Sequence, residues 1–144
     1  MARMPIHWIE ATTHAHATED EGRVLQAIDA ACPGGPIDRS ALEGHFGNPI
    51  VRLSRRLDAP GAIRGAWSRW EDAGLLPAIA PGAEARVDED GVLHFRLDKQ
   101  AAFQGVLALA RDGDAIDVRV RIEAYPSRPE AHRRVVRELL SGGR

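Results

Sequence analysis

The stretch "AIDVRVRIEA", residues 115–124, decides the fold class because its apolar and polar residues alternate strictly. Successive side chains of a β-strand point to opposite faces of the sheet. Ile116 and Val118 therefore begin an apolar face, and Asp117 and Arg119 begin a polar one. A strand with one buried and one solvated face is typical of an antiparallel sheet.

The sequence on either side of this strand predicts two helices and a hairpin. Residues 128–140, "RPEAHRRVVRELL", form an amphipathic helix whose inward residues are Val135, Val136, Leu139 and Leu140. Residues 99–113 predict a second helix, although Gly105 interrupts its pattern. Residues 83–98, "AEARVDEDGVLHFRLD", predict two short strands that turn at "DEDG".

The N-terminal half predicts strands and helices in alternation. Residues 5–17 alternate as a strand, with Ile6, Trp8 and Thr12 on one face. Thr18 and Glu21 have the spacing of a capping box, which predicts a helix that "CPGGP" ends at residues 32–36. We expect one helical turn at 40–43, a strand at 50–58 and a helix at 60–76. Trp67 and Trp70 in that helix have the spacing of core residues rather than of base-stacking platforms.

This element order predicts an α+β fold with a mostly antiparallel sheet covered by helices, in a single domain over residues 1–144 with a core at about 5–141. Hydrophobic residues make up 44% of the chain and charged residues 28%, as in ordinary globular proteins. The sequence shows no leader and no membrane-spanning run, which predicts a cytoplasmic protein. The single cysteine, Cys32, is interpreted as a small buried residue rather than a reactive thiol.

The segment "LEGHFGNPI", residues 42–50, concentrates residues with unusual backbone preferences. Gly44 and Gly47 permit positive φ, and Pro49 begins a strand without a ladder N–H. One interpretation is a tight turn whose Phe46 fills the core. The other is a loop that presents His45, Asn48 and backbone amides to a phosphate or a base.

A second dense segment, "HFRLDKQAAFQG" at residues 94–105, combines donors with a helix start. Asp98 is placed to cap the helix that begins at Lys99. Arg96 and Lys99 beside that helix start could form an anion site, or could pair with nearby acids on a solvated face. The basic closing helix is likewise interpreted mainly as a solvated face.

Catalytic and metal-binding patterns are weak in this sequence. His14 and His16 share a strand face, and His45 could approach them, but no cysteine pair, HExxH motif or carboxylate cluster accompanies these histidines. Serine-hydrolase and phosphate-loop motifs are missing as well. We therefore expect no enzymatic activity, no metal and no cofactor.

Three segments together resemble a known family. The segments "ATEDEGRVLQAI", "LEGHFGNPIV" and "FRLDKQAAFQG", in this order, closely resemble the archaeal RNA-binding-domain family whose members are described as predicted subunits of the RNA-degrading exosome. The resemblance covers about residues 5–140. It implies a fold similar to the large-subunit ribosomal protein that binds 5S rRNA, and RNA binding without catalysis.

The resemblance and the residue patterns together define the expected site. The expected partners are single-stranded or looped RNA and proteins of the exosome or the ribosome, with no membrane. The alternative is an adaptor that docks on an RNA-processing complex with little RNA contact, and an exposed apolar patch would favour it. The expected RNA-binding residues are His45, Asn48, Arg52, Arg56, Arg96 and Lys99. The expected structural residues are Thr18, Glu21, Gly44, Phe46, Gly47, Pro49 and Asp98.

Overall fold

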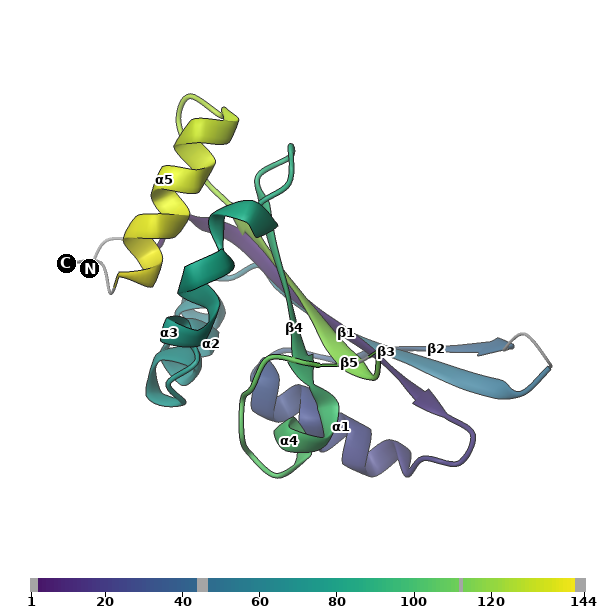
Figure 1. Ribbon diagram of the computed structural model, residues 1–144. Coiled ribbons are helices and arrows are strands. Elements are labelled where there is room, and N and C mark those ends of the chain that lie inside the picture. The colour runs from purple at the N-terminus through teal and green to yellow at the C-terminus, as the bar shows by residue number, and fades with distance from the viewer. Residues whose placement is uncertain (1–2, 44–46, 112, 142–144) are drawn as a thin grey trace.

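A single antiparallel sheet organises the computed structural model, which describes residues 3–43, 47–111 and 113–141. Within these residues five strands lie in the spatial order β2-β3-β1-β5-β4 (Figure 1). Every neighbouring pair is antiparallel, which confirms the predicted fold class. The strands are β1 (Ile6–His16), β2 (Asp38–Glu43), β3 (Pro49–Leu57), β4 (Val92–Asp98) and β5 (Ala115–Ile122).

The helices gather on one side of this sheet (Figure 1). α1 and α4 pack against each other, and α5 lies beside α3 near the other end of the strands. None of the helices in the described ranges is long and apolar enough to cross a membrane. The helices are α1 (Glu21–Ala31), α2 (Pro60–Asp72), α3 (Leu76–Ile79), α4 (Lys99–Phe103) and α5 (Pro129–Leu140), with 3-10 turns η1 (Ala80–Gly82) and η2 (Glu84–Arg86).

The core fills the space between the helices and the apolar face of the sheet. Trp70 is fully buried, and its ring meets that of Phe95 edge to face at 5.4 Å between centroids. The Trp70 indole N–H donates a 2.6 Å hydrogen bond to the carbonyl of Ala31, which joins α2 to the end of α1. Trp67 and Trp70 are therefore core residues, as their spacing predicts.

Arg55 holds the loop that follows α1 against β3. Arg55 is buried on the core-facing side of β3, where it donates to the carbonyls of Cys32 and Gly35 and pairs with Asp29 at 2.6 Å. Burial raises the pKa of the Cys32 thiol to about 12, although the Arg55 charge opposes the rise. Cys32 is thus protonated at neutral pH, in agreement with the interpretation of a buried residue.

Two elements differ from the prediction because tertiary pairing overrides local preference. Residues 38–43 form strand β2 rather than a helical turn, since they pair along β3, with Ser40 opposite Arg52. The predicted hairpin at 83–98 retains its turn and its second strand, which is β4. In place of its first strand, residues 84–86 form a 3-10 helix, and Val87 alone pairs with β4, through a bridge to Leu93.

Two helix boundaries also differ. α4 ends at Phe103 instead of near Gly113, because Gly105 adopts φ +83° and closes a Schellman cap through the N–H groups of Gly105 and Val106. The N-cap of α1 is Asp20, which accepts from the N–H of Gly22, so the predicted cap from Thr18 is wrong.

The face assignment of Ile6 is also corrected. A register shift between Ile6 and Trp8 marks a bulge in β1. The extra residue turns Ile6 into the core, away from the face that Trp8 shares with Thr12. The closing helix behaves nearly as expected: Val136 is buried, its predicted apolar neighbours are partly buried, and Ala131 and His132 are buried as well.

Candidate nucleic-acid interface

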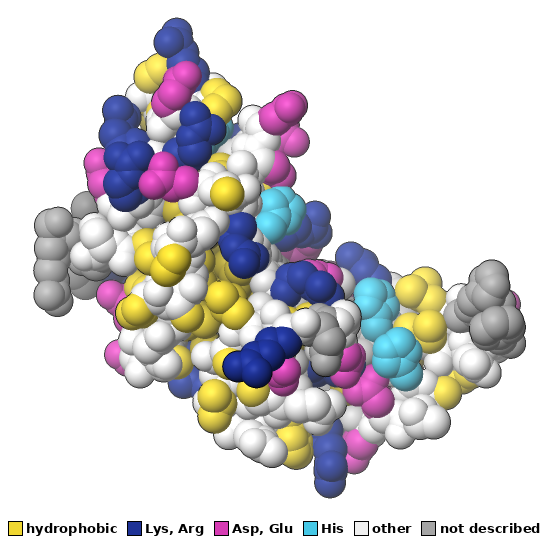
Figure 2. Space-filling model, in the orientation of Figure 1, with side chains coloured by type: hydrophobic (Ala, Val, Ile, Leu, Met, Phe, Trp, Pro, Cys, Tyr) yellow, Lys and Arg dark blue, Asp and Glu magenta, His cyan; other side chains and the backbone are white. Residues whose placement is uncertain are grey.

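The sheet face opposite the core is polar and carries no helix in Figure 1. The registers place alternate residues of each strand on it, and arginine and histidine together outnumber the carboxylates among them. Figure 2 shows arginine and histidine side chains close together over this part of the molecule. We call it the open sheet face. Its basic members are Arg52, Arg56, Arg96, Arg119, His14, His16 and His94, and its acidic members within the strands are Glu10, Asp38, Asp98 and Asp117.

A groove of about 490 Å³ lies in the middle of the open sheet face. It crosses four strands, because its lining comes from β3, β1, β5 and β4. We call it the sheet-face groove. Its lining residues are Thr12, His14, Arg52, His94, Phe95, Arg96, Asp117, Val118 and Arg119.

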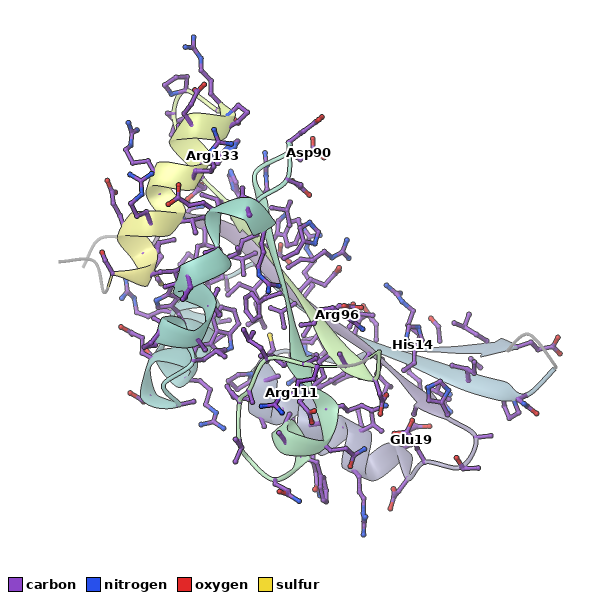
Figure 3. The ribbon with its side chains drawn as sticks, viewed as in Figure 1. His14, Glu19, Asp90, Arg96, Arg111 and Arg133 are labelled. Carbon is purple, nitrogen blue, oxygen red and sulfur yellow. The ribbon has the colours of Figure 1, made fainter. Side chains whose placement is uncertain are left out.

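Arg96, which is labelled in Figure 3, lies on β4, and its side chain lines the groove. Its Nε donates to Asp117 Oδ1 at 3.0 Å and its Nη2 to the carbonyl of Gly113 at 2.9 Å. The side chain stays 48% exposed. The ion pair therefore positions the guanidinium without removing it from solvent, and such exposed pairs exchange readily for other anions.

Two further arginines hold partners on the same face. Arg119 donates to Glu10 and Arg56 to Asp58. The Arg56 guanidinium also lies 4.5 Å above the centre of the Trp8 ring, a cation–π arrangement that covers the aromatic surface. Trp8 is therefore not a free stacking platform in this conformation.

Arg52 differs from these arginines because it has no ion pair with any residue in the described ranges. It lies directly opposite His14 across the β1–β3 pair, so both side chains stand on the same face. The groove thus contains one guanidinium whose charge is not neutralised by a neighbouring acid.

The turn before β4 orients another donor at the groove. His94 Nε2 lies 2.8 Å from Asp88 Oδ2, and Asp88 Oδ1 accepts from the N–H groups of Asp90 and Val92. Burial alone would raise the pKa of Asp88, but the hydrogen bonds from His94 and the backbone outweigh it and the pKa is lowered. Asp88 therefore stays ionised and fixes the His94 ring.

A comparison with protein families covers the strands that form the groove. A family model described as RNA binding matches residues 8–122, which include every residue that lines the sheet-face groove. This chain belongs to that RNA-binding family. α5 lies outside the matched range.

Proteins that are similar to this chain come from several archaea. A curated RNA-binding protein of Pyrococcus abyssi is 34% identical over 97% of both chains. The solved structure of a DUF54 protein from Methanothermobacter thermautotrophicus is 37% identical and has a TM-score of 0.80, covering 94% of this chain and 98% of that one. A second structure, from Archaeoglobus fulgidus, is 35% identical with a TM-score of 0.83, over 93% and 99%.

In this family member Lys99 lies inside the fold rather than on the open sheet face. Its side chain is 2% exposed, and Nζ contacts Asp114 Oδ1 at 2.7 Å, Glu19 Oε2 at 2.9 Å and the carbonyl of His14 at 2.9 Å. The expectation that Lys99 contributes to an exposed contact surface is therefore wrong. The only lysine of the chain instead ties the end of β1 to the loop before β5.

The segment of residues 42–50, which was expected to contribute to the site, connects β2 and β3 at the far end of their hairpin. Gly44, His45 and Phe46 fall outside the described residues. Gly47 adopts φ +77° and Pro49 opens β3, both as predicted. Asn48 is exposed and lies four residues before Arg52, about 13 Å along the strand. The groove thus unites Arg52 with Arg96, while Arg56 lies farther along the open sheet face and Asn48 lies toward the hairpin tip.

The expected structural residues have mixed outcomes. Asp98 caps α4 by accepting from the N–H of Ala101 at 2.8 Å, as predicted. Glu21 does not close a capping box: its carboxylate pairs with Arg39, and that hydrogen bond lowers its pKa. Thr18 is exposed beside the start of α1.

His16, Glu19 and Asp114 have ligand atoms within 4.8 Å of one another, the arrangement of a small cation site. The Lys99 ammonium already contacts both carboxylates of this group. Their charge is therefore compensated by the protein itself. Glu19 and Asp114 therefore take part in ion pairs with Lys99 in this structure.

Sequence reasoning overlooked Thr12, Arg119 and Asp117 as members of the site. The signal was present for the last two, because the alternation in residues 115–124 already placed Asp117 and Arg119 on the polar face of their strand. What the sequence could not supply is the strand order, which puts β5 between β1 and β4 and so brings these residues between His14 and Arg96.

Proposed function

We propose that this protein binds RNA through its open sheet face and catalyses no reaction. The observation that carries the proposal is the concentration of arginine and histidine on a helix-free antiparallel face, in a chain whose formal net charge is −2. Membership of the RNA-binding family supports the same function.

Each part of the face has a chemical role in this proposal. The guanidinium groups of Arg52, Arg96 and Arg119 supply paired N–H donors that suit phosphate oxygens. His14 and His94 can donate to or accept from a base edge or a ribose 2′-hydroxyl. Arg56 and Asn48 extend the contact along β3 toward both of its ends.

The proposed ligand is single-stranded or looped RNA. Such RNA leaves its phosphates and base edges accessible to a shallow groove, whereas the sequence-bearing groove of an RNA duplex is deep and narrow. The chain carries little net charge, so hydrogen bonds must contribute together with phosphate contacts.

The proposed setting is accessory work in archaeal RNA processing, such as at the exosome. The archaeal origin of the named relatives and the resemblance of the three sequence segments support it. The adaptor alternative gains no comparable support from the comparisons. The large apolar side chains that are exposed in the described ranges are Leu42 on β2, Val106 between α4 and β5, and Tyr125 between β5 and α5.

Fluorescence anisotropy with labelled single-stranded, hairpin and duplex RNAs, titrated across salt, tests the proposal. We expect micromolar or tighter binding to the first two and weaker binding to the duplex. The logarithm of the affinity should fall with the logarithm of the salt concentration, by about 0.7 for each phosphate contact to a single strand. Absence of binding to all three RNAs at low salt would contradict the proposed function.

A further inference from the structure

Thr12 poses a problem that the fold alone does not explain. Its side chain sits on the open sheet face within the sheet-face groove, the residue is 8% exposed, and its Oγ1 is shielded and has no hydrogen-bond partner in the described part of the chain. Buried hydroxyl groups nearly always have a partner. The next residue shows the usual situation, since Thr13 Oγ1 donates to the carbonyl of Ala115 at 2.9 Å.

Two donors whose side chains have no partner among the described residues lie beside this hydroxyl. His14 lies two residues along β1 on the same face, and Arg52 is the direct cross-strand partner of His14. Thr12 and Arg52 are therefore diagonal neighbours, about 7–8 Å apart at their backbones and within reach of long side chains. Each of these three residues lines the groove.

The charge around these donors favours an anion. Arg55, Arg56, Arg96 and Arg119 each pair with a carboxylate, whereas Arg52 pairs with none among the residues that the structure describes. Asp117 lines the same groove, but Arg96 neutralises it at 3.0 Å. A site that combines an uncompensated guanidinium with an imidazole and a hydroxyl offers several donors to one group rich in acceptor oxygens.

We propose that Thr12, His14 and Arg52 form a subsite for one phosphate group of the RNA backbone. The Arg52 guanidinium donates to two phosphate oxygens, and the Thr12 hydroxyl and an N–H of His14 donate to the remaining acceptors. The inference rests on the proposed function for the source of the phosphate, and it goes beyond that function by naming the subsite.

Access to the Thr12 hydroxyl requires the surrounding long side chains to move. The Arg96 and Arg119 side chains are 48% and 42% exposed. Both side chains line the same groove as Thr12, and partly exposed arginine pairs contribute little to stability, so these side chains can move when phosphate enters. The subsite is therefore formed on binding, and the orphan hydroxyl gains its partner at that moment.

The test combines inorganic phosphate and a short labelled single-stranded RNA as separate probes. Both are titrated into the wild type, Thr12→Val, Thr12→Ser and Arg52→Gln, with two-dimensional NMR as the readout. Thr12→Val is nearly isosteric and suits a strand, so it should fold, and an unchanged spectrum verifies this. Matched controls are Thr18→Val and Arg111→Gln, whose positions do not line the groove.

The expected result is that phosphate shifts the signals of Thr12, His14 and the Arg52 side chain. Thr12→Val should weaken phosphate and RNA binding about tenfold, the typical effect of a hydrogen bond to a charged group. Thr12→Ser should restore most of it, and Arg52→Gln should weaken both more strongly. The control variants should bind as the wild type does.

The possible results distinguish a failure of the phosphate subsite from a failure of the proposed RNA binding. RNA binding that none of the groove variants changes would overturn the subsite and leave the proposed function intact. Phosphate binding at Thr12 and Arg52 without any RNA binding would support the anion site and overturn the function. An effect of Arg52→Gln without an effect of Thr12→Val would refute the role of the hydroxyl. Free glutamate, titrated as a third probe that carries carboxylates, should bind more weakly than phosphate, and equal binding would refute the phosphate assignment.

Discussion

Lys99 and Asp114 form an ion pair of 2.7 Å in which the lysine side chain is 2% exposed. The same ammonium contacts Glu19, so one buried cation joins the end of β1, the start of α4 and the loop before β5. The charge that the sequence suggested for RNA is therefore used inside the fold, and this changes what substitution of Lys99 should do.

Lys99→Met should lower the free energy of unfolding by about 1–3 kcal/mol, because Glu19 and Asp114 lose their buried partner but remain partly exposed to solvent. RNA affinity of the folded fraction should stay unchanged. Chemical denaturation measures the first quantity and anisotropy the second. Arg96→Ala is the comparison, with a stability change below about 1 kcal/mol because its ion pair is exposed. Equal stability losses in the two variants would refute this account of Lys99.

Asp117→Asn should tighten RNA binding. Asp117 is the carboxylate closest to Arg96 in the sheet-face groove, so its neutralisation frees that guanidinium and removes a repulsion from phosphate. Anisotropy at two salt concentrations should show a higher affinity and a steeper salt dependence than in the wild type. Asp72→Asn on α2 changes the same charge away from the groove and serves as the control. A lower RNA affinity of Asp117→Asn would contradict this prediction and would show that the ion pair with Asp117 is needed to position Arg96 for binding.

His132 makes the stability depend on pH. It is 2% exposed; burial lowers the pKa of its imidazole, the Arg121 charge lowers it further, and Asp88 partly opposes both. The folded state therefore binds fewer protons than the unfolded state below pH 6.5, the ordinary value. The stabilisation is complete above pH 6.5 and is lost as the pH falls toward the lowered pKa of the folded state.

Thermal melts at pH 7.5, 6.5 and 5.5 test this behaviour. The wild type should lose more stability than His132→Gln between the two lower values, because the variant has no imidazole to protonate. Carboxylates with lowered pKa, such as Glu84, act at lower pH and do not disturb this window. Parallel curves for the two proteins would rule out His132 as the origin.

Trp70→Phe should destabilise the protein by about 1–3 kcal/mol, since it leaves the buried carbonyl of Ala31 without its donor and removes part of a fully buried ring. Denaturant melts give the value. Trp67→Phe keeps that hydrogen bond and should cost less, so the order of the two variants is diagnostic. A reversed order would mean that ring volume, and not the indole N–H, decides the effect.

Local signals predicted much of this fold. Alternating side chains located β1, β3 and β5, helical spacing located α1, α2 and α5, and the cap at Asp98 marked the start of α4. The errors arose where pairing partners decide the structure. β2 exists because β3 offers a backbone edge, and the short α4 follows from the positive φ of Gly105.

The site was harder to predict than the fold, because it depends on contacts between distant strands. Arg96 is exposed and Arg52 is half-buried, and both line the groove, but the strand order that unites them across β1 and β5 has no local signal. Lys99 shows the converse case. Its partners Glu19 and Asp114 are 80 and 15 residues away in the sequence, so nothing near Lys99 indicated its burial.

The open sheet face is the central claim, and a charge-reversal comparison tests it most directly. Arg52→Glu with Arg96→Glu alters the groove, and Arg111→Glu with Arg134→Glu makes the same change in net charge at positions that do not line it. Both double variants are titrated with the same single-stranded RNA by anisotropy at matched salt. We predict at least about a hundredfold loss of affinity for the groove variant, from two lost phosphate contacts at a typical 1.5–3 kcal/mol for each charged hydrogen bond, and less than about threefold for the other. Equal losses in the two variants, or no loss in the groove variant, would contradict RNA binding at this face.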